Sequence, residues 1–363
     1  MKAIVVSLVV GLVLAVCGRS AAEKPTAGGP GGDAHAPTSP EVWFCTARAL
    51  DLAGADARWD FVRRRLTGIQ LFIDQVNEAG PDELRSLVEV VEEAGLKVSI
   101  ECGGTLGFAP LDDTNGEESA RIELAKIDKW YRAGGKVDYL NLDGPVRRLL
   151  YPTSRRRRAS AFTSIGRCAR ELVDYTRAVN RRYPEIQFFL LTNFPNWGYR
   201  GGVSYHGRGE NRQDWGDYDE VVTTALEILD EENVPLAGVT VDNPYEYLIG
   251  EHFSVTFRDP AEVNWLRRVR AYEDFARERG LQFNLIINSE AGGEESDRAF
   301  FERTLKMLDA YLAAGGRPTR YIVESWYEHP KAIVPEDEPH SLTALVKAVI
   351  ERLQAAGKER GER

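Results

Sequence analysis

Short apolar runs alternate with longer amphipathic stretches from Val42 almost to the C-terminus, and this alternation constrains the fold more than any other feature of the chain. A short run rich in β-branched and aromatic residues predicts a buried strand, and an amphipathic stretch predicts a helix that covers it. The expected strands are Val42–Thr46, Gly68–Asp74, Lys97–Glu101, Asp138–Asp143, Gln187–Asn193, Ala237–Asp242, Gln282–Asn288 and Tyr321–Glu324. The expected helices begin near Ala57, Pro81, Glu117, Ser160, Tyr218, Pro260, Glu294 and Ser341.

Such a regular series of strand–helix pairs predicts an α/β fold, a single (β/α)8 TIM barrel over residues 41–356. A doubly wound open sheet is the alternative, although it rarely contains so many regular units. Glycines stand where helices should end before the next strand, at Gly95, Gly134, Gly280 and Gly315. The segments that follow strands are long, whereas those that precede strands are short. Functional loops are therefore expected at the C-terminal face of the barrel.

Residues 1–22 have the features of an export signal. Lys2 precedes an apolar run over residues 3–16, which is too short for a membrane-spanning helix. Two processing routes are open: lipidation of Cys17, which would tether the protein to a membrane, or conventional cleavage after Ser20-Ala21-Ala22. Both lead out of the cytoplasm, to the periplasm, the cell exterior or the outer surface as a lipoprotein.

The segment 23–40 contains many glycines and prolines and predicts a flexible linker, and residues 357–363 predict a charged tail. The net charge of −10 argues against nucleic acid as a partner, because binding phosphates requires a basic surface. Three cysteines follow the linker, Cys45, Cys102 and Cys168, and we expect buried free thiols. The sequence leaves the oligomeric state open.

Acidic residues recur near the ends of the predicted strands. Strand side chains alternate between the barrel interior and the helix layer, and the helix-facing set must be apolar. Polar residues at the shared parity should therefore face the interior. Those expected to meet at one mouth are Asp74, Glu101, Asp143, Asp242, Glu290 and Glu324. Any one of them can instead cap the following helix, but together they favour acid/base chemistry, because crowded carboxylates acquire raised and separated pKa values.

Aromatic residues accompany polar ones in the loops that follow the fifth, sixth and eighth predicted strands. Rings stack on the apolar face of a sugar, and amides, carboxylates and guanidinium groups bind its hydroxyls. Loop aromatics also form small cores of their own. The substrate-binding candidates are Asp74, Glu101, Arg147, Asn193, Trp197, Tyr199, Asn243, Tyr245, Asn288 and Trp326.

The segment Val137-Asp138-Tyr139-Leu140-Asn141-Leu142-Asp143-Gly144 resembles the fourth-strand motif of the α-galactosidase-type barrel glycosidases. This resemblance implies that Asp143 is the nucleophile and that Asp242, after the sixth strand, is the acid/base. Asn141 stands where that family has a lysine. In the larger barrel glycosidase group, whose nucleophile is a glutamate on the seventh strand, Glu290 would be the nucleophile. Glu324-Ser325-Trp326 is similar to the eighth-strand ends of several barrel glycosidases.

These features favour an exported glycoside hydrolase that acts on a carbohydrate without a cofactor or metal ion. Asp143 and Asp242 are the first-choice catalytic pair, and Glu290 and Glu324 are the alternative pair. A metal-dependent sugar isomerase, epimerase or lyase is the first alternative, although no histidine stands at a predicted strand end. The second alternative is a non-catalytic, surface-tethered carbohydrate-binding barrel.

Overall fold

The computed structural model describes residues 39–54, 57–152, 161–204, 215–252, 255–256 and 264–361. All of them belong to the second of two compact units, Pro37–Arg363. The predicted export signal, Cys17 and nearly all of the predicted linker lie outside the described residues. Among the helices that are described, none combines the length and apolar character needed to span a membrane.

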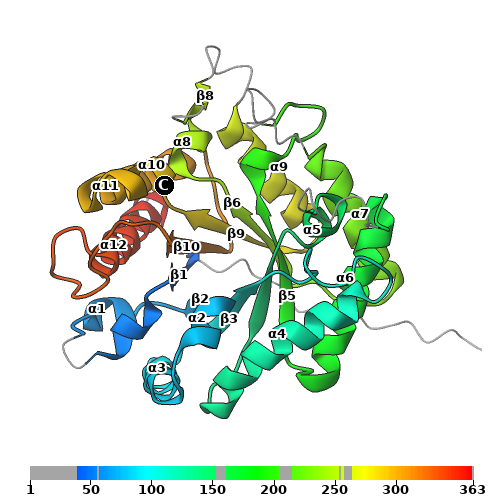
Figure 1. Cartoon of the computed structure of the whole chain (residues 1–363). Coiled ribbons are helices and arrows are strands. Elements are labelled where there is room, and N and C mark those ends of the chain that lie inside the picture. The colour runs from blue at the N-terminus through cyan, green and yellow to red at the C-terminus, as the bar shows by residue number, and fades with distance from the viewer. Residues whose placement is uncertain are drawn as a thin grey trace, which may run out of the picture. The chain divides into compact units, whose positions relative to one another are not determined.

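Eight parallel strands form a closed barrel, with the longer helices around it (Figure 1). The barrel strands are β1 (Glu41–Thr46), β2 (Gly68–Phe72), β3 (Lys97–Cys102), β4 (Tyr139–Asp143), β5 (Gln187–Asn193), β6 (Gly238–Asp242), β9 (Gln282–Ile287) and β10 (Arg320–Ser325). Their order around the barrel is β1-β10-β9-β6-β5-β4-β3-β2. The predicted (β/α)8 barrel is therefore confirmed. A separate antiparallel pair, β7 (Glu251–His252) and β8 (Val255–Thr256), lies in the loop after β6.

The described helices include the long helices that the sequence predicts and several short ones that it does not. They are α1 (Asp60–Arg63), α2 (Ile73–Glu78), α3 (Pro81–Glu93), α4 (Asn115–Arg132), α5 (Pro145–Leu150), α6 (Ile165–Arg182), α7 (Tyr218–Glu231), α8 (Tyr245–Leu248), α9 (Trp265–Glu278), α10 (Glu290–Glu295), α11 (Asp297–Ala313) and α12 (Leu342–Gly361). The short helices α2, α5, α8 and α10 lie directly after strands. The charged C-terminal segment is helical as far as Gly361.

The apolar core has two parts, as the alternation of strand side chains requires. The larger part lies between the strands and the surrounding helices, and the smaller part fills the barrel interior. At the N-terminal end of the barrel, the buried Arg320 guanidinium lies 4.6 Å from the Trp43 ring and 4.9 Å from that of Phe189. A Cβ on Gly68 would lie 2.3 Å from the Trp43 ring, so only glycine fits there. These residues close the barrel floor.

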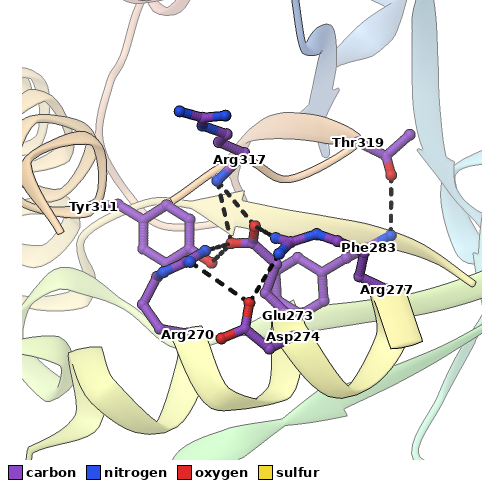
Figure 2. Close-up of polar contacts among 8 residues, drawn as sticks. All are labelled: Arg270, Glu273, Asp274, Arg277, Phe283, Tyr311, Arg317 and Thr319. Atoms are coloured by element: carbon purple, nitrogen blue, oxygen red, sulfur yellow. Dashed lines mark hydrogen bonds and ion pairs between the residues drawn. The ribbon is translucent and has the colours of Figure 1, made fainter. Parts of the chain in front are cut away.

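Glu273 on α9 is the centre of a polar cluster at the N-terminal end of the barrel (Figure 2). Its carboxylate, which is 1% exposed, accepts hydrogen bonds from Arg270, Arg277, the Tyr311 hydroxyl and the backbone N–H of Arg317. These contacts connect α9 to the end of α11 and to the segment that precedes β10. The buried charge is thus fully surrounded by donors.

Candidate active site

A cavity of about 640 Å³ opens at the C-terminal ends of the strands. Its base contains four carboxylates, and its outer part contains three more together with an exposed tryptophan. The lining residues used below are Phe72, Asp74, Gln75, Glu78, Glu83, Glu101, Asp143, Asn193, Asp242, Glu324 and Trp326. None of the described residues that line it is a lysine, arginine or histidine. The C-terminal face of the barrel, where the long loops were predicted to carry the function, therefore contains a strongly acidic cavity.

The four carboxylates at the base come from four different strands. Glu101 and Glu324 are the penultimate residues of β3 and β10, and Asp143 and Asp242 are the last residues of β4 and β6. Residues of the same parity, such as Tyr139 on β4 and Ile322 on β10, belong to the cluster inside the barrel. The parity argument is confirmed for these four side chains.

The strand order places the four carboxylates around the mouth in the sequence Glu101, Asp143, Asp242 and Glu324. Asp143 and Asp242 lie on either side of β5, and we call this the β5 wall. Glu101 and Glu324 are separated by β2 and β1, and we call this the β1–β2 wall. The outer acidic residues Asp74, Glu78 and Glu83 follow β2 in the chain, on α2 and α3.

Asp143 on the β5 wall pairs with Arg148 of α5. Gly144, with φ 57° and ψ 47°, turns the chain directly into α5, and glycine adopts this left-handed conformation without strain. The turn brings Arg148 back to Asp143, where its Nε donates to the Asp143 carbonyl oxygen at 2.7 Å and its Nη2 donates to the carboxylate. The guanidinium stabilises the negative charge of Asp143.

Asp242 has a different environment from Asp143. It is 9% exposed, and its described hydrogen bond is a long one of 3.4 Å from Asn288 Nδ2. The pKa of Asp242 is raised to about 7, chiefly by burial and also by the charges of Asp143 and Glu290, although the Asn288 hydrogen bond lowers it. The β5 wall therefore combines a carboxylate paired with a cation and a carboxyl group that exchanges its proton near neutral pH.

Gln70 connects the two glutamates of the β1–β2 wall. Its Nε2 donates to Glu101 at 2.8 Å and to Glu324 at 3.4 Å, and its Oε1 accepts from Asn141 at 2.9 Å. Burial raises the pKa of Glu324 to about 8, with a further contribution from the charge of Asp242. Burial and then the charge of Glu324 raise the pKa of Glu101 well above its usual value. The described residues supply no cation that pairs directly with either glutamate.

Two predicted carboxylates are not part of the base. The second strand was predicted to reach Asp74, but β2 ends at Phe72 and Asp74 belongs to α2. Its side chain is 72% exposed, pairs with Lys126 at 2.7 Å and lies at the outer edge of the cavity. Glu290 is the first residue of α10 and is not among the residues that line the cavity. Its charge nevertheless acts on Asp242.

The predicted substrate-binding residues separate into two groups. Trp326, 55% exposed, and Asn193 line the cavity. The others do not: Arg147, Trp197, Tyr199, Asn243, Tyr245 and Asn288. Trp197 and Tyr199 are buried in an aromatic cluster beside the barrel, and Asn243 and Asn288 are fully buried next to the β5 wall. Arg147 stacks on Trp215 at 4.7 Å. The expectation that Trp197 and Tyr245 line the cavity with Trp326 is wrong.

Gln70, Glu78 and Glu83 were not predicted from the sequence as residues of the site. Gln70 has the inward parity and could have been assigned to the site on that signal. Glu78 and Glu83 lie on helices, and no sequence pattern indicated which side of these helices faces the cavity.

Two further buried glutamates hold the turns after strands. Glu123 on α4 accepts from the backbone N–H groups of Gly103 at 2.7 Å and Gly104 at 3.2 Å, directly after β3. Glu246 on α8 accepts from the Ser289 hydroxyl and from the backbone N–H of Glu290 at 3.1 Å. Both contacts fix strand ends that carry or neighbour the cavity carboxylates.

The acidic side chains of the mouth do not form a ready metal site. Within the described part of the chain, no three His, Cys, Asp or Glu side chains are grouped so that they could hold a metal ion. The cysteines Cys45, Cys102 and Cys168 are buried and free, as predicted.

No family model matches the chain, and no curated protein matches its sequence. Among solved structures, a GH5_18 glycoside hydrolase from Streptomyces cattleya in complex with GlcNAc is 13% identical, with a TM-score of 0.48, over 87% of this chain and 80% of that one. D-psicose 3-epimerase with D-tagatose from Clostridium cellulolyticum H10 is 10% identical, with a TM-score of 0.42, over 86% and 98%. A sugar phosphate isomerase/epimerase from Parabacteroides distasonis is 11% identical, with a TM-score of 0.43, over 88% and 96%. These similarities are distant and concern the barrel architecture alone.

Proposed function

We propose that the chain is a glycoside hydrolase whose catalytic pair is Asp143 and Asp242. The observation that supports this most is the contrast between two carboxylates in one cavity. Asp143 is paired with Arg148, and Asp242 is buried with a pKa raised to about 7. Glycosidic bond cleavage requires one carboxylate that stays charged and one carboxyl group that donates a proton.

In the proposed reaction, Asp143 attacks the anomeric carbon while Asp242 protonates the leaving oxygen, so that the glycosidic bond breaks as the glycosyl–Asp143 bond forms. Asp242 then takes a proton from water, and the resulting hydroxide attacks the anomeric carbon and releases Asp143. The exposed Trp326 indole supplies an apolar face on which a sugar ring can stack.

The test uses a panel of 4-nitrophenyl glycosides and unactivated disaccharides. Asp143→Asn should lower kcat on both kinds of substrate by at least about 100-fold. Asp242→Asn should lower kcat/KM mainly for the disaccharides, because 4-nitrophenolate leaves without protonation, whereas the second step, in which Asp242 activates water, is slowed for both kinds of substrate. Asp82→Asn, on the exposed start of α3, is the matched control and should retain full activity. An equal loss of kcat/KM on both substrates in Asp242→Asn, or full activity in Asp143→Asn, would exclude this assignment.

We also propose that the protein is exported and that residues 1–22 direct it. The support is the charged start and apolar run of this segment. Cell fractionation of the full-length protein and of Cys17→Ala tests both parts. A lipoprotein loses its membrane association in Cys17→Ala, whereas a conventionally cleaved protein is unaffected. Recovery of the uncleaved chain in the cytoplasm would contradict export.

A further inference from the structure

The β1–β2 wall has chemistry that the proposed hydrolysis does not use. Glu101 lies on β3, next to the strand of Asp143, Glu324 is separated from Asp242 by β9 alone, and both glutamates line the cavity. Glu324 is 3% exposed, and its described partners are neutral groups, the Gln70 amide at 3.4 Å and the Cys45 thiol. A buried carboxylate that is satisfied only by weak neutral donors is costly.

The outer part of the same wall is also acidic. Asp74, Glu78 and Glu83 line the cavity beyond Glu101, and Lys126 is the one described cation that pairs with any of them. An anionic ligand would meet repulsion along this whole side. A neutral sugar would leave the two buried glutamates uncompensated.

Aromatic surface borders the carboxylates. Trp326 follows Glu324 by two residues, lines the cavity and is 55% exposed, and Phe72 lines it between Glu101 and Glu324 in strand order. Carboxylates beside aromatic faces bind an organic cation through charge-assisted hydrogen bonds and cation–π contact. An ammonium group has three N–H donors, so one such group can serve two carboxylates at once.

We propose that the substrate of this cavity carries a protonated amine, as in a sugar with a free amino group, and that Glu101 and Glu324 bind it while Trp326 stacks beside it. This inference deepens the proposed hydrolase function by naming its substrate class. It places the cation at the β1–β2 wall and the reacting bond at the β5 wall, next to Asp143 and Asp242.

The test is calorimetric binding of glucosamine, N-acetylglucosamine and glucose to the full chain. These probes share one ring and differ at a single position, in an amine, an acetamide and a hydroxyl. We expect glucosamine to bind at least about tenfold more tightly than the other two. Because the pKa values of Glu101 and Glu324 are raised in the empty cavity, amine binding at pH 7 should release protons to the buffer.

Glu101→Gln and Glu324→Gln should each abolish the preference for the amine, and their melting curves check that the variants fold. Glu89→Gln, on the exposed face of α3 outside the cavity, is the matched control and should keep it. Equal binding of glucose, no binding of glucosamine, or an unchanged preference in both cavity variants overturns the proposal. Amine binding without turnover of any glycoside would overturn the hydrolase and leave the amine site standing. Turnover of neutral glycosides without a preference for the amine would support the hydrolase and overturn the amine site.

Discussion

Glu273→Gln should destabilise the protein without affecting the cavity at the other end of the barrel. The Glu273 carboxylate is 1% exposed and accepts from two arginines, a tyrosine hydroxyl and a backbone N–H (Figure 2). Glutamine keeps the shape, loses the charge and turns an N–H₂ group toward donors that then have no acceptor.

The magnitude follows from the exposure of each partner. Arg277 is 57% exposed and regains water when the bond is lost, so it contributes little. Arg270 is 19% exposed and Tyr311 is fully buried, so both lose a charge-assisted hydrogen bond away from water, and Arg270 keeps only its 3.6 Å contact with Asp274. Removing one partner from such a buried group costs about 3 kcal/mol. At 2–4 °C per kcal/mol, this corresponds to a fall in Tm of roughly 6–12 °C.

The assay is urea unfolding followed by tryptophan fluorescence, with Asp274→Asn as the matched control. Asp274 contacts the same two arginines but is 49% exposed, so its neutralisation should cost less than about 1 kcal/mol. Equal costs for the two variants would refute the reasoning that burial, and not the number of ion pairs, sets the energy. A cost below about 1 kcal/mol for Glu273→Gln would refute it as well.

Three further predictions concern the cavity. The kcat/KM of the hydrolase should fall as pH rises through about 7, because Asp242 must be protonated to act as the acid, and Asp242→Asn should remove this limb of the pH profile. The free energy of unfolding should decrease as pH rises from about 4 to above 8. In that window the unfolded chain has released protons that folded Asp242 and Glu324 still hold, and at roughly 1.4 kcal/mol per pKa unit either group contributes at most about 5 kcal/mol. Urea titrations at several pH values test this, and a flat profile would contradict it. Trp326→Ala should weaken ligand binding about tenfold with little change in Tm, because the ring on which the sugar stacks is removed. Phe108→Ala, at a similarly exposed position outside the cavity, should change neither quantity. Unaltered binding in Trp326→Ala would exclude stacking.

The barrel was predictable because short apolar runs alternate regularly with longer amphipathic stretches, and its inward residues were predictable because strand side chains alternate between two faces, of which the helix-facing one is apolar. Glu101, Asp143, Asp242 and Glu324 lie within that alternation, and their inward direction followed from the requirement that the helix-facing side be apolar. The prediction was wrong for Asp74, because the direction of successive side chains follows a different period once the strand has given way to a helix. Asp74 lies two residues beyond the end of β2, in a helix, where each residue turns the side chain by about 100° and no longer by 180°.

The aromatic residues were harder to place because an irregular loop has no period. Trp197 and Tyr199 have the composition of a sugar-binding loop, but both pack against the helix layer, where Tyr199 contacts Phe194 and Tyr272. Trp326, by contrast, follows β10 directly, is exposed and lines the cavity. Arg148 pairs with Asp143 because Gly144 turns the chain directly after β4 into the short helix α5, which returns Arg148 toward the strand end.

The closed floor of the barrel also determines where ligands enter and leave. Arg320, packed against the rings of Trp43, Tyr139 and Phe189, leaves the strand interior no second opening at its N-terminal end. A polymer therefore cannot thread through the barrel and emerge on the other side. A ligand that enters through the mouth must also leave through it, so each product has to dissociate before the next substrate can bind.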